Sequence, residues 1–469
     1  MFLINFKREL QLLTRNGWFV ALTLLLLILV TYAVHNGHAH YEQRQSELTE
    51  LQLQRQTERD GLKKVADEMA NGESPDNYFN VSPIRVSIST GALATIDPNP
   101  HSVLAIGQSD LYAQQFKVSS REDLALLSFT ELSNPVQLLL GNFDLAFVVI
   151  YLLPLLVIAF SYNLFSAEKE SGSLQLLAAN PVNLKVWLLQ KTLIRFIIVS
   201  LIFVLAVVGS CFLYSVPLDT GTFKMLLCAL AYMSFWFSLT YLVGSLGRSS
   251  EKNAVYGIGL WIVLVLIIPS AVSQTANSIY PTPSRAVLIN EVRLLKKEIS
   301  KKQDEVLDQY LRNHPELAAD DANASMFWKN YFASQEMMET SLEPLIVDFE
   351  GKLQQQQDWV SRLRFLSPAV VVMDIYNEAG STSTRHYASF KDQVVDFHIT
   401  WREHFLPFVF ENKMLTSGDL DKLPVFTFDD HVVKTRITPN LIYLLIITLL
   451  QTFLGLAFRY RSSFLLVKN

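Results

Sequence analysis

Long apolar runs alternate with polar stretches along the whole chain. Six of the runs have about 20 residues, the length that a helix needs to cross the hydrocarbon core of a bilayer. The pattern therefore predicts an all-α membrane protein with six transmembrane helices. No small-residue cleavage site follows the first run, so we expect it to be retained as a signal-anchor. The expected spans are residues 17–35, 144–164, 191–215, 222–247, 254–273 and 440–460.

Two long polar segments interrupt this pattern, at residues 36–143 and 274–439, and together they exceed half of the chain. They are too polar to lie within a bilayer. We therefore expect two insertions on one side of the membrane.

The composition of each insertion indicates its class. Strong helix formers fill residues 40–69, so the helix of the first span is expected to continue there and to end at the turn residues 71–75. Residues 81–95 alternate more like strand and loop, which makes the first insertion mixed α/β. The second is expected to be mainly helical, with helices at 285–311 and 324–363.

Each insertion ends in a short apolar stretch that contains a proline. These stretches, residues 132–140 and 366–373, are too short to span a bilayer. We expect interfacial or re-entrant helices at the outer face. The alternative is a buried core helix of the external domain.

Basic residues predict the orientation, because Lys and Arg concentrate in the cytoplasmic flanks of membrane spans. If all six spans are real, nearly all of the basic flanks fall on one side. Both termini and the loop at 165–190 should then lie in the cytoplasm of a bacterium, with the chain crossing its inner membrane. The basic residues on that side are Lys7, Arg8, Arg15, Lys169, Lys185, Lys191, Arg195, Arg248, Lys252, Arg459, Arg461 and Lys468.

Composition agrees with a membrane location. Half of the 469 residues are hydrophobic, 18% are charged and the mean hydropathy is +0.24, whereas about 25% of a soluble domain is charged. A net charge of −5 gives no reason to expect nucleic-acid binding. No nucleotide-binding loop G-x-x-x-x-G-K-[ST] and no G-x-S-x-G, H-E-x-x-H or C-x-x-C motif occurs. We therefore expect a non-catalytic chain with no cofactor of its own.

The middle of every span lacks ionisable residues. Ion-coupled carriers usually place such groups near the midplane of the membrane. If the protein moves a substrate, its energy should therefore come from a partner.

The most informative segment is the polar stretch at residues 168–177, which lies between two apolar runs. It contains Gly172, which permits an otherwise strained backbone, and Asn180-Pro181 follows it and disfavours continuation of a helix. A short segment of this kind between two spans can transmit force to a soluble partner.

This stretch resembles the signature of type-2 ABC exporter permeases. The resemblance rests on Glu168-Lys169-Glu170-Ser171-Gly172-Ser173-Leu174-Gln175-Leu176-Leu177, Asn180-Pro181-Val182 and Lys191, with Ser173 in place of the usual Thr. The runs Gly141-Asn142-Phe143-Asp144-Leu145-Ala146-Phe147 and Tyr151-Leu152-Leu153-Pro154-Leu155 resemble a subfamily with two large extracytoplasmic insertions, annotated mainly as a domain of unknown function. The order of spans and insertions agrees over the whole chain, and the specific motifs lie within residues 134–191.

The resemblance implies a half-transporter that pairs with a second copy or a paralogue. A dimer of cytoplasmic ABC ATPases, which binds ATP and Mg²⁺, would drive it to export a substrate or to extract one from the membrane. Residues 1–16 would form an elbow helix on the inner membrane surface, with Phe2, Phe6, Leu10 and Leu13 on one face. The residues that would couple to the ATPase are Glu168, Glu170, Gly172, Ser173, Leu174 and Pro181.

A second class of function stays open, because the insertions are large for a simple pore. The chain could be the membrane anchor or a mechanotransmission subunit of an envelope-assembly complex. An additional periplasmic partner would fit this hypothesis.

Several residues within the spans are candidates for function. Four aromatic residues could line a path for an apolar substrate, and core packing is the alternative interpretation. Two prolines could be hinges or static kinks. The aromatic residues are Tyr232, Phe235, Trp236 and Tyr241, and the prolines are Pro154 and Pro269.

Three histidines, His35, His38 and His40, lie where the first span emerges. Imidazole is a common metal ligand. One short triplet without supporting carboxylates fits no standard metal site well, so a polar collar at the membrane surface is the preferred interpretation and no metal site is predicted.

Overall fold

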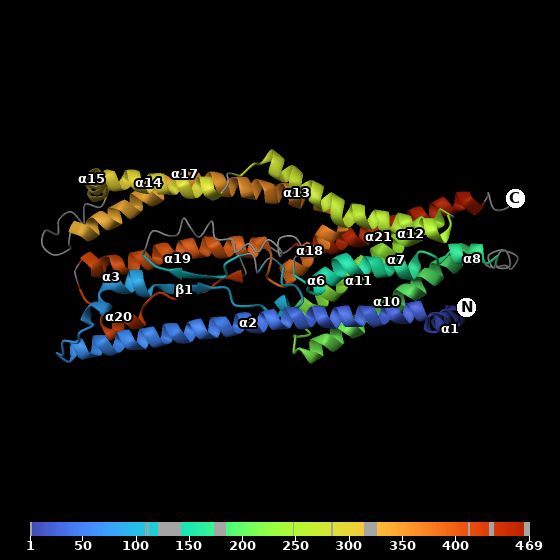
Figure 1. Cartoon of the computed structure of the whole chain (residues 1–469), viewed down its shortest axis with the longest axis horizontal. Coiled ribbons are helices and arrows are strands. Elements are labelled where there is room, and N and C mark those ends of the chain that lie inside the picture. The colour runs from blue at the N-terminus through green and yellow to red at the C-terminus, as the bar shows by residue number, and fades with distance from the viewer. Residues whose placement is uncertain are drawn as a thin grey trace.

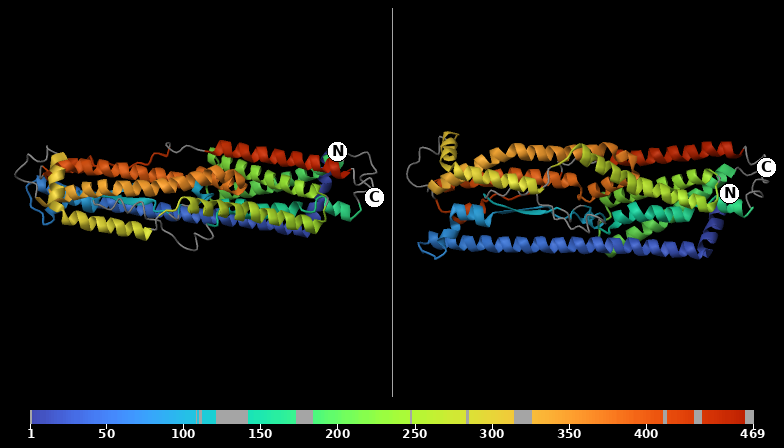
Figure 2. Two further views of the ribbon diagram at one scale, coloured as in Figure 1. Left: turned by 90° about the horizontal axis from the view of Figure 1, so that it is seen from above. Right: turned by 45° about the horizontal axis from the view of Figure 1, so that its top comes forward.

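The protein is an elongated set of helices that run nearly parallel to one long axis (Figures 1 and 2). A computed structural model describes residues 2–463, except 108, 110–111, 121–141, 173–183, 247, 283–284, 314–325, 411–412 and 431–435. Helix α1 (Phe2–Arg15) and the last turns of α21 (Ile437–Ser463) lie at the same end of the molecule, which we call the terminal end.

Six helical segments in the described part of the chain are long and apolar enough to cross a bilayer, which confirms the predicted class. They form a bundle at the terminal end, and the rest of the chain forms a distal domain beyond it (Figure 1). The spans are α2 (Gly17–Ala70); α6 (Leu145–Phe147), η4 (Val148–Leu152), α7 (Leu153–Ser161) and α8 (Ser166–Glu170) together; α10 (Leu184–Leu213); α11 (Thr220–Ser245); α12 (Ser250–Trp261), η5 (Ile262–Ile267) and α13 (Ile268–Ile279) together; and α21.

Helix α2 belongs to both parts of the molecule. The Asn16 side chain caps its start by accepting a hydrogen bond from the Trp18 N–H, and the chain leaves it at Asn71 and Gly72, where φ is +83°. Its 54 residues correspond to about 80 Å of helix, far more than the roughly 30 Å of a hydrocarbon core. The helix therefore continues into the distal domain, as the helix formers at residues 40–69 predict.

Helix α11 is the centre of the bundle. It contacts α7, α10, α12 and α21, and 72% of the residues in its most apolar stretch are buried. The corresponding buried shares are only 11% for the fifth span and 22% for the sixth. These two spans therefore present apolar faces that need lipid or another protein as cover.

The distal domain combines a two-stranded sheet with several helices. Antiparallel β1 and β2 pair with Ala92 opposite Val118 and Thr95 opposite Gln115. Phe116 of β2 stacks on Phe390, which is fully buried. The domain comprises η1 (Tyr78–Val81), α3 (Pro83–Arg85), η2 (Val86–Thr90), β1 (Ala92–Thr95), η3 (Pro100–Val103), β2 (Gln115–Val118), α14 (Arg285–Lys301), α15 (Gln303–Asn313), α17 (Met326–Leu363), η6 (Arg364–Leu366), α19 (Thr384–Phe410) and α20 (Ser417–Asp421), together with the far half of α2. Helix α18 (Pro368–Ala379) lies where the domain meets the spans.

Two local predictions need correction. Within residues 81–95 only β1 is a strand, because Ser82 caps a helical turn by accepting from the Arg85 N–H and Pro83 starts it; Gly91, with φ of +61°, ends the helical stretch. The single helix expected at 285–311 is two helices, since the chain turns sharply at Lys302 between α14 and α15 (Figure 2).

The apolar stretch at 366–373 forms helix α18, and its neighbours show where it belongs. α18 packs on α11 and α21, and its apolar side chains join the core of the span bundle. The Ser367 hydroxyl donates to the Leu264 carbonyl of η5 at 2.6 Å, and the Tyr376 hydroxyl donates to the Met225 carbonyl of α11 at 3.2 Å. α18 is thus inserted between the distal ends of the spans. The similar stretch at 132–140 lies outside the described residues.

A buried histidine makes the distal domain sensitive to acid. Burial, with the charge of Arg402 nearby, lowers the pKa of His398 to about 4. An unfolded histidine has a pKa of about 6.5, so the stabilisation from the neutral ring is complete above that pH and is lost as the pH falls towards 4. We expect about 2 kcal/mol of this loss between pH 7 and pH 5. Urea unfolding of the full chain in nanodiscs measures this loss. The free energy of unfolding of His398→Asn should fall less between pH 7 and pH 5 than that of the wild type, and an equal fall would contradict the prediction.

Candidate coupling site

The short helix α8 lies at the terminal end of the bundle, beyond the end of α7 (Figure 1). The Ser166 hydroxyl, which is fully buried, hydrogen-bonds to the Ser250 hydroxyl at 2.8 Å. The Asn253 amide donates to the Ser166 hydroxyl and to the Tyr162 carbonyl at 3.5 and 3.4 Å. The start of α8 is therefore fastened to the first turn of α12.

An ion pair connects α8 to the third span. The Lys191 Nζ lies 2.7 Å from Glu168 Oε1, and the two side chains are 11% and 25% exposed. The same ammonium lies 5.2 Å from the centre of the Trp187 ring, a distance at which the ring attracts a cation. Because both charges are largely removed from water, loss of one would leave the other poorly compensated.

A second carboxylate connects α8 to the fifth span. Glu170 accepts hydrogen bonds from the Ser250 N–H at 2.8 Å and from the Ser250 hydroxyl at 2.9 Å. Ser249, the residue before α12, makes no capping bond with its own side chain. Glu170 therefore caps α12 from another helix, and its charge is favourable at a helix N-terminus.

Helix α1 is fastened to the third span at the same level. Glu9, which is 5% exposed, accepts a hydrogen bond from Arg195 Nε at 2.8 Å, and the Asn5 amide donates to Gln190 at 3.1 Å. Arg195 also donates to the Phe160 carbonyl of α7. Thus α10 is the element on which α1, α7 and α8 converge.

A family model, described as ABC-2 family transporter protein, matches residues 3–465. The chain belongs to the ABC-2 transporter family. It is therefore a multi-pass membrane protein and a permease component of an ABC transporter, and membership of the family implies partnership with an ABC ATPase. Permeases of this family are typically non-catalytic. No curated protein matches the chain.

The structure places only some of the predicted coupling residues of this ABC-2 permease. Glu168 and Glu170 turn towards the spans, and Gly172 follows with φ of +75° and open space around the position of a Cβ. Three further coupling residues lie outside the described residues: Ser173, Leu174 and Pro181.

The elbow helix predicted for the permease corresponds to α1, with one difference in its buried face. Leu13 is buried and Phe6 packs against the bundle core, but Leu10 is 39% exposed. Glu9 takes the buried position beside them. Nothing is described of the Phe2 side chain.

The four aromatic candidates for a substrate path are all buried. Tyr232, Phe235 and Trp236 form one cluster on α11, in which Phe235 and Trp236 meet edge to face at 5.5 Å. Tyr241 lies apart, in a small cluster with Phe165 and Leu188. In this conformation the four residues fill the space between helices, which favours the interpretation that they are core packing residues. A role in a substrate path stays a prediction.

Each candidate hinge proline is the second residue of an α-helix that follows a π-helical segment. Pro154 comes after η4 and Pro269 after η5, where the Leu153 and Ile268 N–H groups each bond to a carbonyl five residues back. A proline has no N–H and disrupts the α-helical ladder, so a local change of register is expected there. The prolines therefore mark real irregularities, and movement at them stays a prediction.

Side chains from other elements donate hydrogen bonds to a backbone carbonyl in each irregular segment. The Ile150 carbonyl, four residues before Pro154, accepts from the Tyr232 hydroxyl at 3.2 Å. The Leu264 carbonyl, five residues before Pro269, is the one that Ser367 of α18 holds. Each irregular segment is thus held by a specific contact with another helix.

Removal of the Tyr232 hydroxyl should therefore cost more stability in the wild-type chain than in a chain without Pro154. Tyr232→Phe should lower the free energy of unfolding by about 1 kcal/mol, because the Ile150 carbonyl loses its partner. In a Pro154→Ala background the new N–H can bond that carbonyl, so Tyr232→Phe should cost less. Thermal unfolding of the four chains in nanodiscs measures the coupling; equal costs in both backgrounds would refute it.

Two histidines of the triplet contact an aromatic ring where the first span leaves the bundle. His35 and His38 pack against the Tyr214 ring at 5.5 and 5.2 Å, and His38 lies 3.2 Å from Glu42. Within the described ranges, no three His, Cys, Asp or Glu side chains are placed to hold one metal ion.

Sequence reasoning missed several residues of the coupling site. Ser250 and Asn253 carry no motif and were not identified. Arg195 offered a signal, because an arginine just inside an apolar run needs an anionic partner. That partner is Glu9.

Proposed function

We propose that a separate cytoplasmic ATPase pushes on α8, and that α8 moves the third and fifth spans together. The observation that carries the proposal is the pair of carboxylate contacts, Glu168 with Lys191 and Glu170 with Ser250. Helix α8 has five residues, and its two carboxylates hold it to the third and fifth spans. A displacement of α8 would therefore be transferred directly to both spans.

The energy source lies outside this chain. The ATPase would bind ATP and Mg²⁺ and close as a dimer, and the permease would change conformation in response. Since the chain is an ABC-2 permease, this division of work between subunits agrees with its family.

The terminal end would face the cytoplasm of a bacterial cell, with the chain in the inner membrane. The basic flanks of the spans support this orientation. The location of α1 and α8 at one end of the bundle agrees with it, since the ATPase can reach only cytoplasmic elements (Figure 1).

A second permease copy, or a paralogue, would complete the substrate path. The exposed apolar faces of α12 and α21 support this, because one chain leaves them without protein cover. Export of a substrate, or its extraction from the membrane, is the activity that we propose for the pair.

A second candidate function is mechanotransmission to an envelope assembly, with a periplasmic partner at the distal domain. The continuous helix α2 favours it, since one rigid element joins the bundle to the distal end. The two functions differ in one respect: only transport requires a substrate to cross or leave the membrane.

The first experiment is co-purification of the chain with its ATPase, followed by ATP hydrolysis in nanodiscs. The double variant Glu170→Ala, Gly172→Pro should lose the permease-dependent hydrolysis, because proline cannot adopt a φ of +75°. Glu251→Ala, an exposed acid in the first turn of α12, is the control. Normal hydrolysis by the double variant, or labelling of Gly172→Cys from the periplasm, would overturn the proposal.

A further inference from the structure

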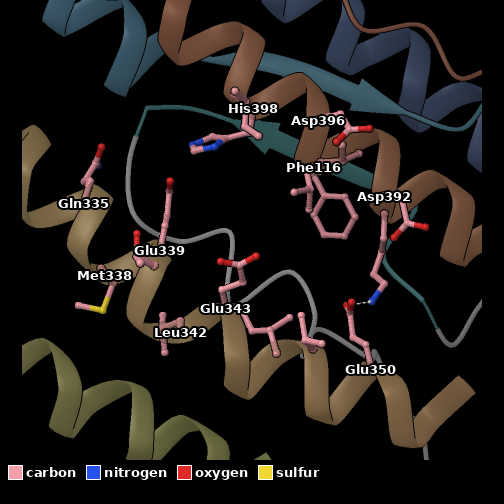
Figure 3. A pocket seen from close by; sticks show the side chains of 17 residues that line it. Phe116, Gln335, Met338, Glu339, Leu342, Glu343, Glu350, Asp392, Asp396 and His398 are labelled. Carbon is pink, nitrogen blue, oxygen red and sulfur yellow. Dashed lines mark hydrogen bonds and ion pairs between the residues drawn. The ribbon is translucent and has the colours of Figure 1, made fainter. Parts of the chain in front are cut away.

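A cavity of about 610 Å³ lies in the distal domain, far from the coupling site. Helices α17 and α19 supply its two walls, and β2 closes one side through Phe116 (Figure 3). Its volume falls within the range of about 300–1,000 Å³ that is typical of sites for small molecules. We call it the distal cavity.

The inner wall of the distal cavity is apolar. Met338 and Leu342 of α17 and Val394 of α19 line it, and all three are at least 96% buried. Such a wall favours the hydrocarbon part of a ligand, since burial of apolar surface contributes about 25 cal/mol per Å².

The mouth of the distal cavity is strongly acidic. Glu350 pairs with Lys391 at 3.0 Å and Glu339 pairs with Arg402 at 2.6 Å, so these two are compensated. No ion pair within the described residues compensates the other three carboxylates. They are Glu343, Asp392 and Asp396.

Asp392 lies close enough to Glu350 and Asp396 to be affected by their charges. Burial and the charges of Glu350 and Asp396 raise the pKa of Asp392, and the opposing charge of Lys391 offsets only part of this rise. A positive charge at the mouth would relieve this repulsion. The electrostatics therefore favour a cation.

Two buried polar side chains inside the cavity lack a partner for one atom each. His398 and Gln335 are 3% exposed and lie on opposite walls, on α19 and α17 (Figure 3). Among the residues that the structure describes, His398 Nε2 and Gln335 Oε1 have no hydrogen-bond partner. A buried polar atom without a partner costs free energy, so a ligand that pairs with it is favoured.

The other atoms of these side chains show which kind of partner they need. The Gln335 amide nitrogen donates to the Ser120 carbonyl at 2.6 Å, which leaves Oε1 as an acceptor. The remaining His398 ring nitrogen bonds to the backbone of Ser119, and burial keeps the ring neutral, so Nε2 is also an acceptor. Acceptors inside and carboxylates at the mouth both require a donor.

We propose that the distal cavity binds an amphipathic organic cation, an ammonium or guanidinium group carried on a compact apolar body. The N–H groups would meet the carboxylates and the two unpaired acceptors, and the apolar body would cover the inner wall. A bare metal ion fits less well, because no three metal-ligating side chains converge in the described part of the chain. The inference goes beyond the ATPase-driven function, since binding needs no ATPase.

The test uses the full chain in zwitterionic nanodiscs with two dansyl probes of opposite charge. Dansylcadaverine ends in an ammonium, and dansyl-6-aminohexanoate ends in a carboxylate. We expect saturable binding of the first, displaced by hexylamine, and no binding of the second. Equal binding of both probes, or displacement by calcium but not by hexylamine, would overturn the proposal.

Variants locate the binding. The double variant Glu343→Gln, Asp396→Asn should weaken binding of dansylcadaverine about tenfold, while Glu403→Gln, an exposed acid of α19 outside the cavity, should leave it unchanged. Val395→Trp, which replaces a partly exposed lining residue, should abolish binding by filling the space. Binding by either of these cavity variants at wild-type strength would show that the cation binds elsewhere.

Discussion

Reversing one charge of the ion pair between α8 and the third span should uncouple the transporter. Glu168→Lys replaces the carboxylate that lies 2.7 Å from Lys191 Nζ with a cation, and neighbouring like charges repel strongly when they are partly buried. ATP hydrolysis by the co-purified complex in nanodiscs should fall about tenfold, the size expected when one contact of a coupling network is lost.

The reciprocal exchange is the decisive control for this prediction. Lys191→Glu alone should be as defective as Glu168→Lys, and the chain with both changes should recover most of the activity, because the pair is restored with opposite polarity. Glu251→Lys, which reverses an exposed charge on α12, should have little effect. A double variant no better than the single variants would mean that the pair does not act as a contact.

The largest loss of stability should come from one methyl group on α2. A Cβ at Gly37 would lie 1.9 Å from the Val103 carbonyl oxygen, a backbone atom that cannot move aside alone. Gly37→Ala should therefore cost about 3 kcal/mol, the upper part of the usual range for overpacking. Thermal unfolding of the nanodisc-embedded chain measures the loss.

The same helix offers the matched control. Gly61 has no atom within 4 Å of an added Cβ. Gly61→Ala should stabilise the protein by about 0.5–1 kcal/mol, because alanine loses less conformational freedom in a helix. If both changes shifted the unfolding temperature in the same direction, the close approach of α2 to η3 would be refuted.

Apolar length and helix composition were enough to predict most of the architecture. The six spans follow from runs of about 20 apolar residues, and the extension of α2 follows from the helix formers at 40–69. Pro154 and Pro269 were predicted as kinks or hinges, and a π-helical segment lies just before each of them. Each of these features depends on residues close together in the chain.

The hydrophobicity of a stretch of sequence does not show whether lipid or another helix covers it. The stretch at 366–373 was expected to be interfacial or re-entrant, with a buried core helix of the external domain as the alternative, and the pattern did not predict that α18 packs on α11 and α21. Lipid and a neighbouring helix select the same residue types. Only the three-dimensional arrangement separates them.

The coupling site was only partly predictable for a similar reason. The motif at 168–177 predicts the coupling segment, and that role stays a prediction, but it gave no sign that the partner of Glu170 is Ser250, 80 residues further along the chain. A serine at a helix start is common and gives no sign of a distant partner. The distal cavity went unpredicted because its walls come from helices whose acidic residues also fit a solvated surface.

The unbroken course of α2 has a geometric consequence for any motion of the first span. About 35 of its residues extend beyond the position where that span was expected to end, which corresponds to an arm of about 50 Å. A tilt of only about 5° within the bilayer would swing the tip of this arm sideways by about 4 Å. Small rotations in the membrane would thus appear as magnified displacements at the far tip.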